Sequence, residues 1–153
     1  MPNDMQNNLP LSSFLTYRLN NLAQMANRAG ARWHQRVSGL TLAEWRIVAT
    51  LGFFGSMSPT DLAARILMDK AVISRVKTVL SDKGLILDEN DSGDSRKRVL
   101  GLTDAGRHLY KSTMPEAQQR QAELMELFTD EELQTLTRGM EKLQDHFERR
   151  MTD

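Results

Sequence analysis

The sequence predicts a mainly α fold with a small β-hairpin wing. We expect a winged helix-turn-helix lobe plus a helical region built from both termini. Three observations predict this fold. Long apolar stripes with helical spacing lie near each end of the chain, and capping signals start several helices between them. Two strand-like runs flank a polar, charged loop in residues 85–100, which is the pattern of a hairpin.

The first predicted helix covers residues 12–37 and carries one continuous apolar stripe. Its apolar residues recur every three or four positions, so they share one face. Gly39 then ends the helix, because glycine easily adopts the left-handed conformation that closes a helix. The stripe consists of Leu15, Leu19, Leu22, Ala26, Ala29, Trp33 and Val37.

Each later helix begins with a side-chain oxygen that can accept a hydrogen bond from a free N–H of the first turn. Two of these starts add a glutamate three positions later, which makes a capping box. A third start has a proline at the first helical position, where its missing N–H is harmless. The predicted N-caps are Thr41, Ser58, Asp69, Thr103 and Thr129, and their helices cover about residues 42–53, 59–67, 70–82, 104 onward and 130–151.

A hairpin is predicted between the fourth and fifth helices. Gly84 stops the fourth helix and turns the chain into Leu85-Ile86-Leu87, and the return strand is Val99-Leu100. The segment between them, Glu89-Asn90-Asp91-Ser92-Gly93-Asp94, has the composition of a turn. The sequence therefore predicts a wing with a charged tip.

These elements divide the chain into an N-terminal dimerisation helix (residues 1–38), a winged helix-turn-helix lobe (41–102) and C-terminal dimerisation helices (103–153). The last helix carries a second apolar stripe. Long striped helices at both termini bury little within so small a lobe, so we expect them to pack on each other and on a second copy, as a homodimer. A monomer in which they pack only within one chain is the alternative.

Composition excludes several classes of site. The chain has no cysteine, so disulfides, thiolate zinc sites and thiol redox switches are excluded. No apolar run approaches the roughly 20 residues of a membrane span, and the first residues lack the pattern of a signal peptide. The expectation is a soluble cytoplasmic protein with no membrane partner.

The net charge is zero, but it is distributed unevenly along the chain. Residues 1–50 hold five arginines against two acidic residues, a net of +3, and residues 65–98 hold eight basic against six acidic residues, a net of +2. Residues 115–153 hold five basic against ten acidic residues, a net of −5. This asymmetry suits a protein that presents one face to a polyanion, although ordinary solvated helix faces would also produce it.

The helix predicted over residues 70–82 has two contrasting faces. Its valine, isoleucine and leucine residues gather on one face, and the opposite face is small, hydroxylic and basic. Small residues let a helix enter the major groove of double-stranded DNA, hydroxyls bond bases or phosphates, and arginine can fork onto guanine. An ordinary surface helix is the alternative. The expected DNA contacts are Ala71, Ser74, Arg75 and Thr78, with Lys70 and Lys77 at the margins on phosphates.

Two neighbouring elements favour DNA over an ordinary surface. Ser58 and Thr60 put a polar helix N-terminus, with its free N–H groups, where a DNA backbone would pass, although Ser58 can also serve only as a cap. At the wing, Arg96 can enter a narrow minor groove, and Asp94 can hold it extended by a carboxylate–guanidinium pair. Lys97 and Arg98 add positive charge beside it.

Six short motifs extend from the second helix onward in a fixed order. They are Thr41-Leu42-Ala43-Glu44-Trp45-Arg46, Asp61-Leu62-Ala63, Asp69-Lys70-Ala71-Val72-Ile73-Ser74-Arg75, Lys83-Gly84-Leu85-Ile86, Asp94-Ser95-Arg96 and Leu102-Thr103-Asp104-Ala105-Gly106. The ordered set resembles the MarR family of bacterial transcriptional regulators. Two positions depart from the family pattern: Ser95 stands where a second arginine is common, and Gly101 is expected to loosen the return strand.

The resemblance implies a homodimer that binds a pseudo-palindromic operator and often represses transcription, with Ser74 and Arg75 on the recognition helix and Arg96 as the wing arginine. It also implies a small aromatic or phenolic acid effector, held between the dimerisation helices and the lobe. Aromatic rings would stack on the effector and cationic groups would bind its carboxylate. The candidate residues are Tyr17, Arg18, Trp33, His34, Trp45 and Arg46. Core packing for the rings, and a bracing role for Arg46, are the alternatives.

Two other function classes fit the sequence less well. An enzyme would need a metal-ligand spacing, a glycine-rich phosphate loop or a nucleophile with its base, and the three histidines form none of these. No cofactor is expected. A winged helix that only binds proteins would carry an acidic or apolar face at residues 70–78, which the sequence lacks.

Overall fold

The structure is a computed structural model that describes residues 9–90 and 98–152. In the described residues, helices precede and follow one two-stranded sheet, an order that confirms the predicted fold class. Contacts within the chain separate two units, one ending at Ser112 and the other beginning at Thr113. The elements are η1 (Leu11–Ser13), α1 (Leu15–Ser38), α2 (Leu42–Phe54), α3 (Pro59–Ile66), α4 (Lys70–Asp82), β1 (Ile86–Asn90), β2 (Arg98–Leu102), α5 (Asp104–Met125) and α6 (Asp130–Thr152).

The predicted N-caps are confirmed by hydrogen bonds. Each of the five side chains accepts a bond from an N–H of the helix that it starts. At α2 the box is complete, because the Glu44 carboxylate accepts the Thr41 N–H at 2.7 Å in return. Glu132 and Thr129 repeat this arrangement at α6. Local side-chain chemistry therefore sets where these helices begin.

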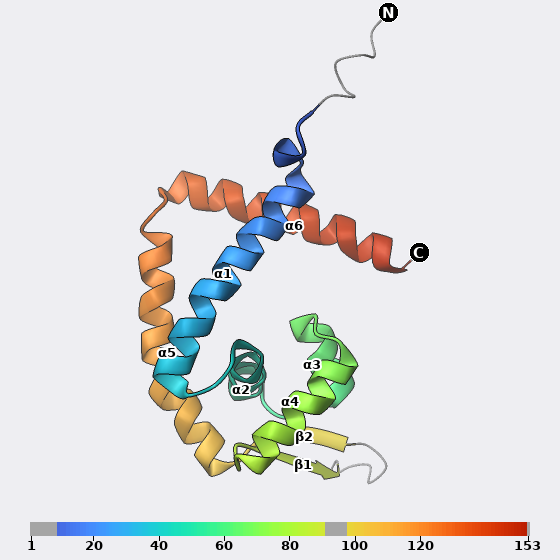
Figure 1. Cartoon of the computed structure of the whole chain (residues 1–153), viewed down its shortest axis with the longest axis vertical. Helices are drawn as coiled ribbons and strands as arrows, with labels where there is room; N and C mark the ends of the chain where they lie inside the picture. The colour runs from blue at the N-terminus through green and yellow to red at the C-terminus, as the bar shows by residue number, and fades with distance from the viewer. Residues whose placement is uncertain (1–8, 91–97, 153) are drawn as a thin grey trace, which may run out of the picture. The chain divides into compact units, whose positions relative to one another are not determined.

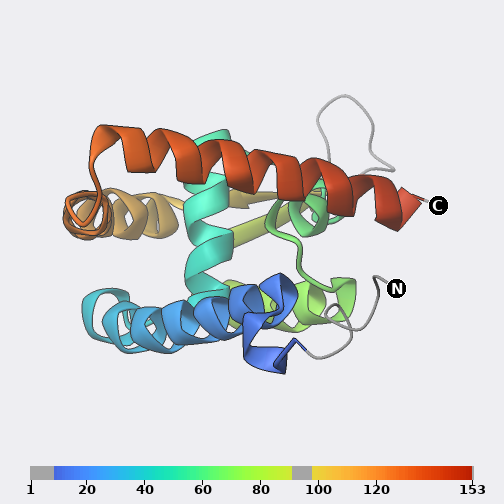
Figure 2. The ribbon, with the colours of Figure 1, turned by 90° about the horizontal axis from the view of Figure 1, so that it is seen from above.

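The core of the first unit lies where α2, α3 and α4 meet the sheet. Figures 1 and 2 show α2 and α4 beside the hairpin in both views. Ile47, Leu62, Leu80 and Leu100 are each 0 % exposed, one residue from each of four elements. Burial of these aliphatic side chains fixes the lobe, since each contributes about 1.5–3 kcal/mol relative to exposure.

The hairpin is longer than the sequence predicted. Glu89 and Asn90, which we expected in the turn, belong to β1, where they pair with Val99 and Arg98. Backbone pairing across the ladder outweighs the turn preference of these residues. Arg98 is thus a strand residue, while the predicted tip residues Asp94, Arg96 and Lys97 lie outside the described part of the chain.

The return strand does not loosen at Gly101. The strand β2 continues through this residue, which pairs with Leu87. A Cβ at Gly101 would lie 2.5 Å from the Ser56 hydroxyl oxygen, so glycine lets the segment before α3 approach the sheet. Next to this contact, Met57 forms an antiparallel bridge with Leu100, with N···O distances of 3.0 and 2.8 Å.

The apolar stripe of α1 is largely exposed. Leu15 is 56 % exposed and Leu22 is 64 % exposed, while Trp33 and Val37 nearer the C-terminal end are partly covered. Phe14, which precedes the helix, is 47 % exposed. Gly39 closes α1 in the left-handed conformation, as predicted.

The second unit consists of the rest of α5, from Thr113, and α6. The α6 residues Leu136, Met140, Phe147 and Met151 are all exposed in the single chain. They belong to the stripe predicted from helical spacing, so much of the apolar face of this helix is also exposed.

Candidate nucleic-acid interface

The outer face of α4 has the composition that the sequence predicted. Ala71, Ser74, Arg75 and Thr78 are all exposed, whereas Ile73 and Leu80 on the opposite face are buried. Thr78 donates its hydroxyl hydrogen to the Ser74 carbonyl at 3.2 Å, which leaves its lone pairs directed outward. The helix therefore offers a narrow polar ridge with one guanidinium group.

The N-terminus of α3 lies beside this ridge. A shallow depression of about 170 Å³ is lined by Pro59, Thr60, Lys70, Ile73, Ser74 and Lys77. It brings Thr60, Lys70, Ser74 and Lys77, four of the expected DNA contacts, onto one surface. Ser58 acts as the cap, because its hydroxyl accepts the Asp61 N–H at 3.1 Å and donates to the Asp61 carboxylate at 2.7 Å.

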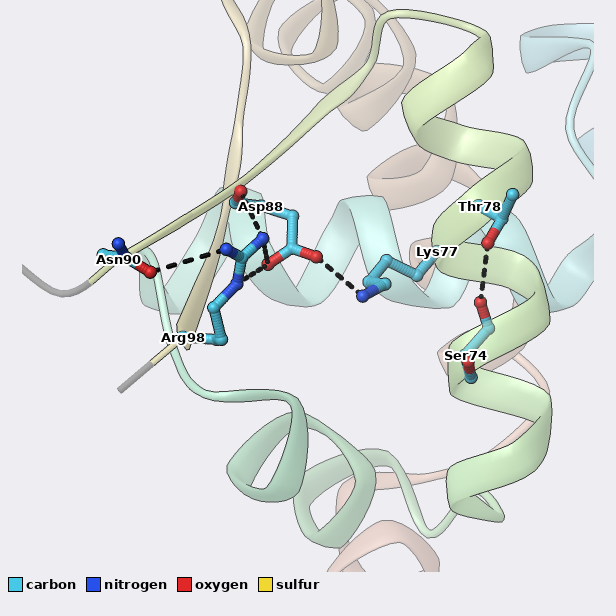
Figure 3. A network of polar contacts seen from close by, with 6 residues as sticks. All are labelled: Ser74, Lys77, Thr78, Asp88, Asn90 and Arg98. Atoms are coloured by element: carbon cyan, nitrogen blue, oxygen red, sulfur yellow. Dashed lines mark hydrogen bonds and ion pairs between the residues drawn. The ribbon is translucent and has the colours of Figure 1, made fainter. Parts of the chain in front are cut away.

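Lys77 and Arg98 converge on Asp88, which the sequence did not single out (Figure 3). The Lys77 ammonium lies 2.6 Å from Oδ2 of Asp88, and the Arg98 guanidinium lies 2.8 Å from Oδ1. Strand alternation is the signal that could have found it, since Asp88 shares the inward face of β1 with buried Ile86. Lys77 and Arg98, both expected to contact DNA, therefore each have an internal carboxylate partner.

The charges around Asp88 keep it ionised. The hydrogen bond from Lys77 lowers the pKa of the Asp88 carboxyl, partial burial acts in the opposite direction, and Arg98 adds to the lowering. A carboxylate with two cations is the stable form of this cluster at neutral pH.

A second ion pair joins α2 to the C-terminal end of α4. Glu44 is 5 % exposed and its Oε1 lies 2.9 Å from the Lys83 ammonium. Burial would raise the pKa of Glu44, but the hydrogen bond from the Thr41 N–H and the Lys83 charge outweigh it, so the pKa is lowered. The α2 capping box thus also anchors α4.

The structure brings together three of the residues expected to bind an effector. The rings of Trp33, His34 and Trp45 cluster with centroid separations of 4.7, 5.5 and 6.2 Å. His34 and Trp45 are buried.

Two of the other three effector candidates lie apart from this cluster, and the third, Arg46, has a partner of its own. Tyr17 and Arg18 lie near the other end of α1, and Arg18 is about 22 Å from Trp33 along the helix at 1.5 Å per residue. Arg46 donates to the Ile66 carbonyl, which fits the bracing role.

The described residues hold no group of three or more histidine, aspartate or glutamate side chains able to bind a metal ion. In the same part of the chain, no single helix is long and apolar enough to cross a membrane. Among these residues, only the bent pair α1 and α2, taken together, has the length and composition of a membrane span.

Comparison with known proteins decides the family. Residues 38–97 match the model of the MarR family. The homoprotocatechuate degradative operon repressor of Escherichia coli is 31% identical over 103 residues, which span 67% of this chain and 70% of the repressor. The chain belongs to the MarR family. It is a transcriptional regulator and not an enzyme.

Solved structures of MarR regulators match nearly the whole chain. A MarR/EmrR family regulator from Acinetobacter sp. ADP1 superimposes with a TM-score of 0.85 at 26% identity, covering 92% of this chain and 99% of that one. The Staphylococcus aureus MepR–DNA complex matches with a TM-score of 0.77 at 17% identity, covering 88% and 98% of the two chains, which shows a shared fold. The winged-helix architecture of this MarR regulator is therefore common to its relatives.

Proposed function

We propose that this MarR regulator is a ligand-responsive repressor that binds a pseudo-palindromic operator as a homodimer. In this proposal α4 enters the major groove and the hairpin wing follows the minor groove. The exposed ridge of Ala71, Ser74, Arg75 and Thr78 carries the proposal, because small and hydroxylic side chains beside one arginine suit base edges. The MepR neighbour was solved as a DNA complex, which supports this use of the fold.

The exposed stripes of α1 and α6 support the homodimer. A protomer in water gains little from leaving Leu15, Leu22 and Phe147 on its surface, whereas a second copy would bury them. Two lobes related by a two-fold axis would read two half-sites, so the operator is expected to be a pseudo-palindrome.

An aromatic or phenolic acid is the effector class that we propose. The E. coli relative is named for homoprotocatechuate, an aromatic acid. Trp33, the partly exposed member of the ring cluster with His34 and Trp45, provides aromatic surface in this chain. Arg46 is the nearest of the proposed cationic candidates in sequence, although it already donates to the Ile66 carbonyl.

The test starts by enriching duplexes from a random library on the wild-type protein. The affinity of the enriched duplex is then measured by gel shift against salt, and the complex is titrated with a panel of aromatic acids. We expect a palindromic consensus and release of the protein by at least one acid. The affinity should fall steeply with salt, by about 0.9 log units for each tenfold rise in salt concentration and each neutralised phosphate.

Three outcomes separate the parts of this proposal. Enrichment without a consensus, or binding that salt does not weaken, contradicts operator recognition. A consensus with a single half-site contradicts the dimer on DNA. Specific binding that no acid releases leaves a regulator without small-molecule control, which is the alternative function.

A further inference from the structure

The Asp88 carboxylate joins three elements of the lobe. One oxygen, Oδ2, accepts from the Lys77 ammonium of α4 at 2.6 Å. The other, Oδ1, lies 2.9 Å from Nε and 2.8 Å from Nη2 of Arg98 on β2. Figure 3 shows the two cations reaching Asp88 from opposite sides, one from the helix and one from the strand. One side chain on β1 therefore connects both strands of the wing to the recognition helix.

Arg98 is fixed by more than this ion pair. Its guanidinium also donates to the Asp88 backbone carbonyl at 2.8 Å and to the Asn90 side-chain oxygen at 3.4 Å. Because Arg98 pairs with Asn90 across the ladder, it is the diagonal neighbour of Asp88 on the same face. The two strands are thus locked to each other at the base of the wing.

Lys77 provides the connection to α4. It lies between Ser74 and Thr78 in the sequence of this helix, beside the exposed ridge, and its side chain is 29% exposed. The Asp88 side chain is 19% exposed, so the pair is partly shielded from water and its geometry is restrained. A change in the angle between the wing strands and α4 would break this contact.

A negative charge at this place is costly for a surface that faces DNA. It neutralises two cations that phosphates would otherwise attract, and therefore weakens binding to any duplex. The contacts of Asp88 with α4 and β2 indicate what offsets this cost, because they restrain the geometry of the surface.

We propose that Asp88 is a positioning residue that sets the wing strands against α4, so that both elements meet the DNA in one fixed arrangement and the operator is distinguished from other DNA. This inference rests on the proposed function. It adds a residue that touches no DNA itself and acts through Lys77 and Arg98.

The direction in which one substitution changes DNA affinity separates a positioning role from a purely electrostatic one. Asp88→Asn keeps the size of the side chain and removes its charge, so on charge alone it would strengthen binding to every duplex. If Asp88 positions the wing, the substitution instead weakens operator binding relative to random DNA. We expect the ratio of operator to random-duplex affinity to fall roughly tenfold, a usual coupling for residues in one network.

Glu89→Gln is the matched control. Glu89 is the next residue of β1, is exposed, and forms no ion pair among the described residues, while the change in charge is the same. This variant should leave the affinity ratio unchanged. Asp88→Glu, which restores the carboxylate, should recover part of the ratio.

A double-mutant cycle with Lys77→Met tests the connection to α4. Loss of a phosphate contact by Lys77 would lower both affinities together, whereas loss of positioning lowers their ratio. We expect Lys77→Met to lower the ratio by itself and to add little to Asp88→Asn. Thermal unfolding of each variant checks the fold. If Asp88→Asn does not fold, the affinity ratio of Lys77→Met alone tests the positioning role.

An unchanged ratio in Asp88→Asn, an equal loss in Glu89→Gln, or additive effects in the cycle would overturn the role of Asp88 while leaving operator recognition intact. A wild-type protein that does not prefer its enriched duplex to random DNA would instead overturn the proposed function, and the positioning role with it.

Discussion

At the scale of single residues, Arg75 is the side chain best suited to read a base. It is exposed on the ridge of α4, and no described residue forms an ion pair with it. Lys77 and Arg98 carry the same formal charge but are held by Asp88. The three cations are therefore not equivalent, although their positions in the sequence make them look alike.

Replacing Arg75 with alanine should cost about 1–3 kcal/mol of operator affinity and much less on random duplexes, if the guanidinium forks onto guanine. Comparing the two affinities by gel shift at one salt concentration measures this difference. Lys70→Ala is the control, because the loss of a lysine that contacts phosphate should lower both affinities alike. Equal losses on both duplexes in Arg75→Ala would assign this residue to phosphate.

At the scale of elements, Glu44 ties α2 to α4. Its folded-state pKa lies below its usual value of 4.5. The carboxylate therefore stabilises the folded protein above that pH, and the stabilisation is lost as the pH falls through the lowered value. Because Lys83 is 39% exposed, water screens the pair and reduces its contribution.

Glu44→Gln should lower the free energy of unfolding by about 1 kcal/mol near neutral pH. The difference from wild type should shrink below the unfolded-state pKa. Urea unfolding over a pH series measures it. Glu132→Gln is the matched control, since Glu132 completes the same capping box on α6 but is exposed and forms no ion pair among the described residues. A difference for Glu44→Gln that does not depend on pH would exclude this ionic contribution.

Sequence reasoning predicted the elements well where local chemistry determines them. Helix starts follow from side chains such as Thr41 and Asp69, which bond to N–H groups two or three residues away. The strand ends were harder, because pairing with a partner strand extended β1 through Asn90. Gly101 was misjudged for a related reason, as its neighbour Ser56 is distant in the sequence.

The candidate site was likewise predictable only where local sequence determines it. The exposed ridge of α4 followed from helical periodicity alone. The cluster around Asp88 did not, because it depends on the register of two strands and on the placement of Lys77. Long-range contacts of this kind have no local signature, and they determine which cations are already held by a carboxylate.

At the scale of the whole molecule, the exposed stripes on α1 and α6 predict the oligomeric state. The wild-type protein should sediment at twice its chain mass of 17.4 kDa. Leu22→Asp should shift it toward the monomer, because a buried, unpaired carboxylate is costly in an interface.

Leu67→Asp is the control for the dimer. Leu67 is 78 % exposed at the end of α3, has a positive φ of 48°, and lies outside both stripes. This variant should remain dimeric. A wild-type protein that sediments as a monomer at micromolar concentration would contradict the homodimer, and a dimeric Leu22→Asp variant would remove α1 from the interface.

The bridge between Met57 and Leu100 has a consequence for solubility. A two-stranded hairpin leaves two free edges, and free edges invite strands of other chains to add to the sheet. On β2 the backbone groups of Leu100 are already bonded to Met57. On β1 the exposed, charged side chain of Glu89 disfavours the approach of a strand from another chain. We expect these two features to disfavour edge-to-edge association of the hairpin.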